Sequence, residues 1–301
     1  MNVRAWIEAM RLRTLPVSIA GVVAALGYAR LLEHANVTVF ILCILFAVLA
    51  QIASNFANEY YDFKAGRDIP GRQGPRRGVT EGDITPEAMK RATLATLAAA
   101  CAVGLSLFFW GGWVILVFGI IIVLGVFAYS AGPFPLSSNG LGEVAVIAFF
   151  GVAPVCLTFF LMCGYVDTYV VAGSIAIGLM GANVLLVNNI RDEADDRAVR
   201  KNTIVVLLGR RTGSFFYLVN GWVAVWLMGS AWMYIGRQWW IVPAVYLFVH
   251  TLVWYRIDTL SRKLMVSRRA TSDSGKSPLN PFLGMTACLM AVYALLFAIA
   301  A

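Results

Sequence analysis

Nine long apolar stretches divide the sequence and leave lipid as the solvent for most of it. They lie at about residues 15–33, 37–57, 91–110, 112–129, 143–163, 168–188, 214–234, 236–257 and 280–301. Of the 301 residues, 60% are apolar and 13% are charged, whereas a soluble domain carries about 25% charged residues. Roughly 20 apolar residues cross a bilayer as one helix, which keeps its backbone amides paired in lipid. The sequence therefore predicts an all-α polytopic membrane protein with nine transmembrane helices, folded as one domain over residues 1–301.

The basic residues are distributed unevenly between the two ends of these helices. With the N-terminus inside, the cytoplasmic segments hold 22 of the 24 Lys and Arg residues, and the other side holds only Arg30 and Arg237. Cytoplasmic segments of membrane proteins carry such an excess, so the N-terminus and the long loops are predicted to be cytoplasmic. The net charge of +8 then reflects topology and contact with anionic lipid headgroups rather than nucleic-acid binding.

Two long cytoplasmic loops, residues 58–90 and 189–211, hold ten of the sixteen acidic residues. Each follows an apolar stretch that ends in asparagine, so similar chemistry recurs four spans apart. This repetition suggests one site assembled between two half-bundles. The first acidic motif, N-E-Y-Y-D-F-K-A-G-R-D, contains Asn58, Glu59, Asp62, Lys64 and Asp68. The second acidic motif, N-N-I-R-D-E-A-D-D-R, contains Asn188, Asn189, Arg191, Asp192, Asp195 and Asp196.

The spacing within both motifs places oxygen ligands on one helix face. If the helices continue past their asparagines, Asn58 and Asp62 share a face, as do Asp192 and Asp196. Oxygen ligands of this kind suit Mg²⁺, which usually completes its shell with substrate phosphates. A single acidic loop would more often be a set of solvated charges. Two such loops on one side, each beside a costly polar residue at a span end, favour paired metal–diphosphate sites.

Cationic residues lie beside both motifs. Arg72, Arg76 and Arg77 occur in a Gly- and Pro-rich stretch, and Arg offers a planar fork suited to phosphate oxygens. Lys201 follows the second motif, although topology alone would also place positive charge at these positions. Before the first span, Arg11 and Arg13 suit either headgroup anchoring or binding of a substrate carboxylate, and composition does not separate these alternatives.

These motifs resemble the UbiA superfamily of intramembrane aromatic prenyltransferases, and most closely its 1,4-dihydroxy-2-naphthoate branch. The resemblance rests on R-L-R-T-L-P, the two acidic motifs, R-Q-G-P-R-R-G, G-P-F-P-L-S-S-N-G-L-G-E, K-N-T and N-P-F-L. Some positions depart from the pattern. Glu59 stands where the family usually has Asp, Arg200 where it has Gly, and Leu207 where it has Arg. Ser138 and Asn139 stand where an aromatic and a basic residue are common.

The resemblance implies a central cavity capped by the acidic loops, Mg²⁺ as cofactor, and a bacterial inner-membrane location without an obligate protein partner. It implies transfer of a polyprenyl group from polyprenyl diphosphate to 1,4-dihydroxy-2-naphthoate, with loss of CO₂ and diphosphate, giving demethylmenaquinol. The metal ligands it implies are Asn58, Glu59, Asp62, Asp68, Asn188, Asp192 and Asp196. The catalytic residues it implies are Asp62, Asp68, Asp192, Asp196 and Lys64. The substrate-binding residues it implies are Arg13, Asn55, Arg72, Arg77, Asn189, Arg191 and Lys201.

Two alternatives stay open at this point. The acceptor could be another aromatic such as 4-hydroxybenzoate, which an acceptor assay would distinguish. A transporter is disfavoured, because its acidic residues would lie near the bilayer midplane, whereas all sixteen acidic residues here fall in loops or at span edges. The sequence leaves open the tail length, the oligomeric state, the number of Mg²⁺ ions and the identity of any general base.

Overall fold

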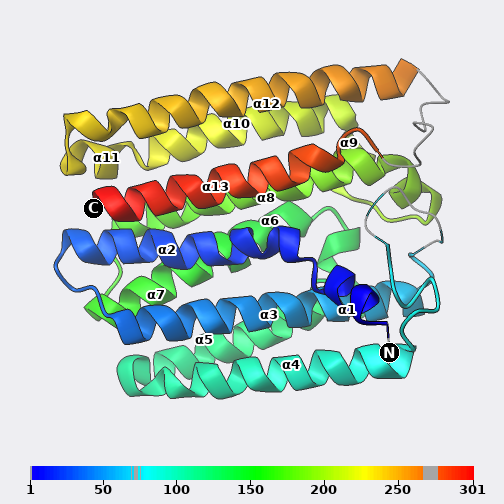
Figure 1. Cartoon of the computed structure of the whole chain (residues 1–301), viewed down its shortest axis with the longest axis horizontal. Coiled ribbons are helices and arrows are strands. Elements are labelled where there is room, and N and C mark those ends of the chain that lie inside the picture. The colour runs from blue at the N-terminus through cyan, green and yellow to red at the C-terminus, as the bar shows by residue number, and fades with distance from the viewer. Residues whose placement is uncertain (1, 69, 71–73, 75, 267–276) are drawn as a thin grey trace.

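The long helices lie side by side as a bundle, with their ends gathered at two opposite faces (Figure 1). The structure is a computed structural model that describes residues 2–68, 70, 74, 76–266 and 277–301. Within these residues, eight helical segments are long and apolar enough to cross a membrane, and a bent helix pair makes a ninth. This arrangement confirms the predicted all-α polytopic membrane fold.

The first half of the bundle contains α1 (Val3–Met10), α2 (Leu15–Leu31), α3 (Val37–Lys64), α4 (Pro86–Ser106) and α5 (Phe108–Ala128). One continuous span with a π-helical turn inside it follows, made of α6 (Gly142–Val146), the π-helical turn η3 (Ile147–Val152) and α7 (Ala153–Cys163). The second half contains α8 (Thr168–Ala198), α9 (Ile204–Leu208), α10 (Arg210–Leu227), α11 (Gly229–Ile235), α12 (Ile241–Val266) and α13 (Asn280–Ala300). The pair α10 and α11 is bent by 42°. Short 3-10 turns lie at η1 (Leu12–Thr14), η2 (Leu136–Ser138) and η4 (Arg237–Trp240).

Several spans begin at a side-chain cap that the sequence supplies. Asn36 accepts a hydrogen bond from the Val39 N–H at 3.1 Å, and Asp167 accepts one from the Val170 N–H at 2.9 Å. Such caps satisfy backbone donors that a helix start leaves unpaired. At the other end, α3 continues to Lys64 and α8 to Ala198. Both acidic motifs therefore lie largely on the last turns of helices, whereas the sequence analysis had assigned most of their residues to loops.

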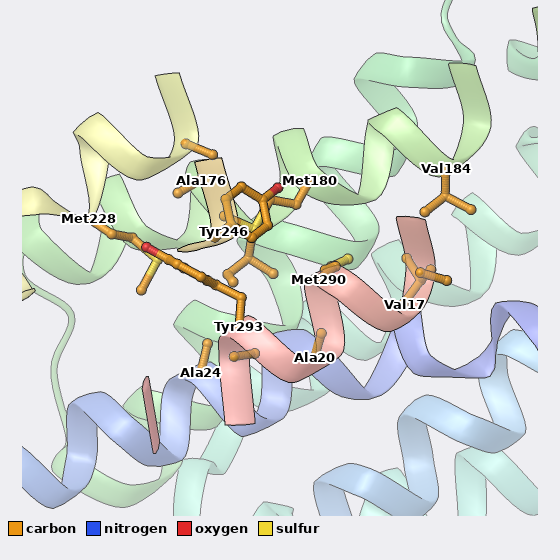
Figure 2. Close-up of a cluster of buried hydrophobic side chains, with 14 of the residues drawn as sticks. Val17, Ala20, Ala24, Ala176, Met180, Val184, Met228, Tyr246, Met290 and Tyr293 are labelled. Atoms are coloured by element: carbon orange, nitrogen blue, oxygen red, sulfur yellow. The ribbon is translucent and has the colours of Figure 1, made fainter. Parts of the chain in front are cut away.

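The main hydrophobic core lies where α2, α8 and α13 pack together, with α10 and α12 completing it. Figure 2 shows the small side chains Ala20 and Ala24 facing Met290 and Tyr293 across this contact. Small residues let membrane helices approach closely, and flexible methionines fill the gaps that remain. The core thereby holds α8, which carries the second acidic motif, in a fixed position.

A close backbone contact joins η3 to α8. A Cβ built on Gly151 would lie 2.4 Å from the Gly178 Cα and 2.4 Å from the Ser174 carbonyl oxygen. Only glycine fits at such a separation. Pro154 follows one turn later and lacks the N–H that would bond to the Phe150 carbonyl, which accounts for the wider helical turn at this point.

Candidate active site

The helix that carries the first acidic motif ends in a left-handed turn at Gly66, where φ is +68°. The Arg67 N–H donates to the Asp62 carbonyl at 2.8 Å, and the Gly66 N–H donates to the Phe63 carbonyl at 3.0 Å. This pair of bonds is a Schellman motif, which reverses the chain over the last helical turn. The reversal brings the Arg67 guanidinium to the Asp62 carboxylate, with Nε and Oδ1 3.0 Å apart.

The helix that carries the second acidic motif ends in the same way. Arg200 is left-handed, with φ of +56°. The Lys201 N–H donates to the Asp196 carbonyl at 2.8 Å, and the Arg200 N–H donates to the Arg197 carbonyl at 3.2 Å. The Lys201 Nζ lies 4.0 Å from Asp196 Oδ1 and 3.8 Å from Asp62 Oδ2. Lys201 therefore lies between an acid of each motif, and the two motifs meet across it.

Substituting Gly66 by alanine is expected to destabilise the turn that places Arg67. A Cβ at this position meets nothing within 4 Å, so the cost comes from the left-handed backbone and amounts to about 1 kcal/mol. Thermal unfolding in detergent measures this change. Gly284→Ala is the matched control, because its Cβ also meets nothing but the residue is helical, and alanine there is neutral or stabilising. Equal melting temperatures for Gly66→Ala and the wild type would contradict the assignment.

Asn58 is the hub of hydrogen bonds on the first-motif side. Its Oδ1 accepts from the guanidiniums of Arg11 at 2.7 Å and Arg77 at 3.2 Å. Its Nδ2 donates to Ser130 Oγ at 2.8 Å and to Asp62 Oδ2 at 3.3 Å. One amide thus ties α3 to the N-terminal segment, to the Arg77 turn and to the residues that follow α5.

The second acidic motif contains its own ion pair. The Arg191 guanidinium donates to both Asp192 oxygens, at 2.7 and 2.8 Å, and also to Asn188 Oδ1. The guanidinium also donates to Asn280 Oδ1 at 3.1 Å, at the start of α13. Bidentate pairs of this kind hold a carboxylate in one orientation. Arg191 therefore fixes Asp192 between α8 and α13.

A polar pocket of about 40 Å³ lies between the two motifs. The predicted site residues that line it are Asn58, Arg77, Asn188, Asn189, Asp192, Asp196 and Lys201. Arg11, Tyr129, Ser137 and Glu143 also line it. The sequence analysis weighed Arg11 without assigning it a role and gave no role to the other three. These three residues lie in the Gly- and Pro-rich segment 129–143, from which no site residue was predicted.

An apolar cavity of about 370 Å³ lies beside this pocket, between α2, α3, α4, α5 and α7. The α3 residues that line it are Cys43, Phe46, Ala47, Ala50, Gln51 and Ser54. From Cys43 to Ser54 this face extends roughly 17 Å at 1.5 Å per residue. Its polar end points toward the first acidic motif, because Asn58 is one turn beyond Ser54.

Tyr129 lines both the polar pocket and the apolar cavity. It follows the last residue of α5, and its side chain is half-buried. Burial raises the pKa of this phenol above its ordinary value, and the nearby carboxylates of Glu143, Asp62 and Asp196 raise it further, against the opposing effect of Arg11. The Tyr129 phenol therefore stays neutral where the polar pocket meets the apolar cavity.

Three predicted residues, Glu59, Asp68 and Asn55, do not line the polar pocket. Glu59 is buried and accepts a hydrogen bond from the Val79 N–H at 3.0 Å, which anchors the turn after Arg77. Asp68 pairs with Arg77 Nε at 3.3 Å. Asn55 donates to the Met10 carbonyl at 2.9 Å and ties the end of α1 to α3. These contacts place all three beside the site, where they support it.

The predicted cations divide into two groups. Arg77 and Lys201 reach the polar pocket, while Arg13 and Lys64 are exposed and do not line it. Arg11, two residues before Arg13, enters the pocket because its own left-handed backbone, with φ of +52°, ends α1 there. Arg72 lies outside the described residues.

The donors in the polar pocket suit a hard divalent cation. Asn58, Asp192 and Asp196 line the pocket, and Asp62 lies next to it, with its Oδ2 3.3 Å from Asn58 Nδ2. These residues present amide and carboxylate oxygens, which are the ligand type that Mg²⁺ selects. Among the described residues, no three His, Cys, Asp or Glu side chains form a ready-made metal centre. Mg²⁺ commonly takes only one or two carboxylates and completes its shell with water and substrate phosphates. The donor set therefore fits an ion that arrives with a phosphate-bearing substrate.

Together, the membrane-embedded bundle, its paired acidic motifs and the adjoining apolar cavity define an intramembrane enzyme site for an amphiphilic anionic substrate. The UbiA prenyltransferase family matches residues 14–271, and the chain belongs to this family. A 1,4-dihydroxy-2-naphthoate octaprenyltransferase from Escherichia coli is 35% identical over 68% of this chain and 69% of its own. Enzymes of that name from Haemophilus influenzae and Mycobacterium tuberculosis are 32% and 37% identical, over 72% and 68% of this chain and 73% and 70% of theirs.

Solved structures share the fold at low sequence identity. A UbiA homolog from Aeropyrum pernix matches with a TM-score of 0.64 and 15% identity over 97% of both chains. A UbiA homolog from Archaeoglobus fulgidus, bound to DMAPP and Mg²⁺, matches with a TM-score of 0.58 and 15% identity over 98% of this chain and 99% of that one. These likenesses extend the family assignment to the arrangement of the whole bundle.

Proposed function

We propose that this chain transfers a polyprenyl group from polyprenyl diphosphate to 1,4-dihydroxy-2-naphthoate, with loss of CO₂ and diphosphate, giving demethylmenaquinol. The observation that carries this proposal is the shared wall at Tyr129. A charged pocket and a long apolar cavity meet at one side chain. A prenyl diphosphate needs both, because its charged diphosphate is bonded directly to its apolar tail. The names of the curated relatives support the naphthoate as acceptor.

The diphosphate belongs in the polar pocket. Asn58, Asp62, Asp192 and Asp196 would hold Mg²⁺, which when bound neutralises charge on the departing diphosphate. Arg77 and Lys201 point into the same space and donate to diphosphate oxygens that the metal leaves uncovered. Arg67 and Arg191 keep Asp62 and Asp192 in fixed orientations. Preorganised charge of this kind stabilises the leaving group as the allylic carbon–oxygen bond breaks.

The prenyl tail belongs in the apolar cavity, along the α3 face from Ser54 to Cys43. The reactive carbon then lies beside Tyr129, where the two compartments meet. A neutral aromatic ring shields a developing allylic cation through its π face, and enclosure by α2, α5 and α7 excludes water that would otherwise capture the cation. The electron-rich naphthoate ring attacks this carbon from the pocket side.

We further propose that the site faces the cytoplasm of a bacterial inner membrane, with the N-terminus inside and with no obligate protein partner. The predicted inner segments hold 22 of the 24 basic residues, and α1 and the ends of α3, α8 and α12 that belong to these segments lie at one end of the bundle (Figure 1). This asymmetry agrees with the positive-inside rule. Both substrates then reach the site from the cytoplasmic leaflet.

Purified protein in proteoliposomes tests the proposed reaction. With labelled polyprenyl diphosphate and Mg²⁺, we expect the tail to appear on the naphthoate with release of one CO₂, and no product after chelation of the metal. Matched reactions with 4-hydroxybenzoate and without acceptor should give at most a few per cent of that product. Preferential labelling of 4-hydroxybenzoate would reject the assigned acceptor, and diphosphate flux without product would reject the enzyme.

A further inference from the structure

Glu143 is a buried carboxylate of the polar pocket that the donor site does not use. It is the second residue of α6, and only 8% of it is exposed. Its Oε1 accepts a hydrogen bond from Asn189 Nδ2 at 2.8 Å. Its Oε2 has no hydrogen-bond partner in the described part of the chain. A buried acceptor without a partner is costly, so this oxygen is suited to a donor that the substrate brings.

Glu143 differs in its surroundings from the aspartates of the two acidic motifs. Asp62, Asp192 and Asp196 each lie within 4.0 Å of a Lys or Arg nitrogen. No such cation pairs with Glu143 among the residues that the structure describes. A carboxylate that is oriented by an amide, and not neutralised by a cation, can accept a proton from a neutral hydroxyl.

The wall around Glu143 carries further polar groups suited to an aromatic substrate. The Ser137 Oγ lines the same pocket, is buried, and lacks a hydrogen-bond partner in the described residues. A Cβ built on Gly142 would lie 3.9 Å from the Tyr129 hydroxyl, so the start of α6 lies next to the junction with the apolar cavity. Gly142 thus keeps the wall between Tyr129 and Glu143 free of a side chain.

We infer that Glu143 binds the acceptor through its hydroxyl group and removes the hydroxyl proton as the ring is prenylated. This inference rests on the proposed function and adds the base that the donor chemistry leaves unassigned. The hydroxyl concerned is the one next to the carbon that bears the carboxylate. Asn189 acts as a positioning residue, because its amide holds Oε1 and leaves Oε2 directed at the substrate.

The step balances without any further reactant. The ring carbon that bears the carboxylate forms a bond to the allylic carbon, whose bond to the diphosphate oxygen breaks, and the diphosphate leaves with that electron pair. The hydroxyl O–H bond breaks, its proton moves to Glu143 Oε2, and its electrons form the ring carbonyl. The product of this step is a β-keto acid, which loses CO₂ and regains an aromatic ring by a proton shift.

Steady-state kinetics of Glu143→Gln in proteoliposomes test the inference. We expect kcat for naphthoate prenylation to fall about 100-fold, the typical contribution of a positioned base. The KM for prenyl diphosphate and the Mg²⁺-dependent binding of a non-hydrolysable prenyl thiolodiphosphate should stay within about twofold of wild type. Glu143→Asp should recover part of kcat, and Glu87→Gln, an exposed acid on α4, should behave as wild type.

Each result decides between this inference and its rivals. If wild-type protein prenylates the naphthoate and Glu143→Gln does so at a similar kcat, the base assignment is wrong while the proposed function stands. If Glu143→Gln loses thiolodiphosphate binding, Glu143 belongs to the donor site. If wild-type protein itself fails to prenylate the naphthoate, the proposed function fails first. Should the glutamine variant not fold, Glu143→Asp with the same two measurements decides the question.

Discussion

Alanine at Asp62 or Asp192 is expected to lower Mg²⁺-dependent prenyl transfer at least 1,000-fold, to about the background rate. Each of these buried carboxylates lies within 3.0 Å of a guanidinium; Asp192 lines the polar pocket and Asp62 lies next to it. Removal of either one takes away an oxygen ligand and leaves an excess of positive charge. A 1,000-fold loss corresponds to about 4 kcal/mol of transition-state stabilisation, the scale expected for charge stabilisation in an enclosed site.

The matched control for the aspartate variants is Glu193→Ala. Glu193 is on the same helix next to Asp192, but its carboxylate pairs with Arg197 at 2.7 Å and with Arg210 at 3.2 Å, outside the polar pocket. Its activity should stay within about threefold of wild type. Melting temperatures in detergent separate catalytic loss from unfolding. An Asp62→Ala or Asp192→Ala protein that keeps near-normal Mg²⁺-dependent turnover would show that the acidic motifs do not serve the reaction.

A bulky side chain at Ala47 is expected to change which donors the enzyme accepts. Ala47 lines the apolar cavity one turn from Cys43 and one turn from Gln51, so phenylalanine there would occupy the path assigned to the tail. The catalytic efficiency for a long polyprenyl diphosphate should fall about 10- to 100-fold, because overpacking costs about 1–3 kcal/mol. Dimethylallyl diphosphate, which is too short to reach this position, should be transferred at nearly the wild-type rate.

Leu45→Phe provides the control for the Ala47 variant. Leu45 is on the same helix but is 44% exposed, on the face directed away from the bundle. The control should treat long and short donors as wild type does. Equal losses for both donors in Ala47→Phe would indicate general damage to the bundle. A long donor accepted as well as by wild type would place the tail elsewhere.

Much of the fold could be predicted because lipid leaves the chain few alternatives. Nine apolar stretches, their lengths and the asymmetric charges led to the bundle and its spans. The ends of α3 and α8 were placed too early because residues such as Asn58, Asp62 and Asp192 do not look helical or buried in sequence. The helices continue because partners far away in the chain satisfy their polar groups: Ser130 accepts a hydrogen bond from Asn58, and Asn280 accepts one from Arg191, which holds Asp192.

Candidate site residues could be predicted where a repeated sequence motif constrained them. Residues that only tertiary contacts bring to the site were missed. The four-residue spacing predicted that Asp62 shares a helix face with Asn58 and that Asp196 shares one with Asp192. Arg11 could not be separated from Arg13, because the choice depends on a single left-handed residue at the end of α1. The family's usual glycine at position 200 has a clear reason here, since the backbone at Arg200 is left-handed and its turn places Lys201.

The contact between Gly151 and Gly178 has a mechanical consequence for the reaction. At that point two main chains touch with no side chain between them. The contact therefore fixes the position of the segment that carries Glu143 relative to the helix that carries Asn189. In the proposed reaction a long donor and a flat acceptor enter and leave the site, and surrounding helices move to let them pass. Because the contact between Gly151 and Gly178 fixes one side of the site, we expect this movement to occur in the opposite wall of the apolar cavity, around α4 and α5.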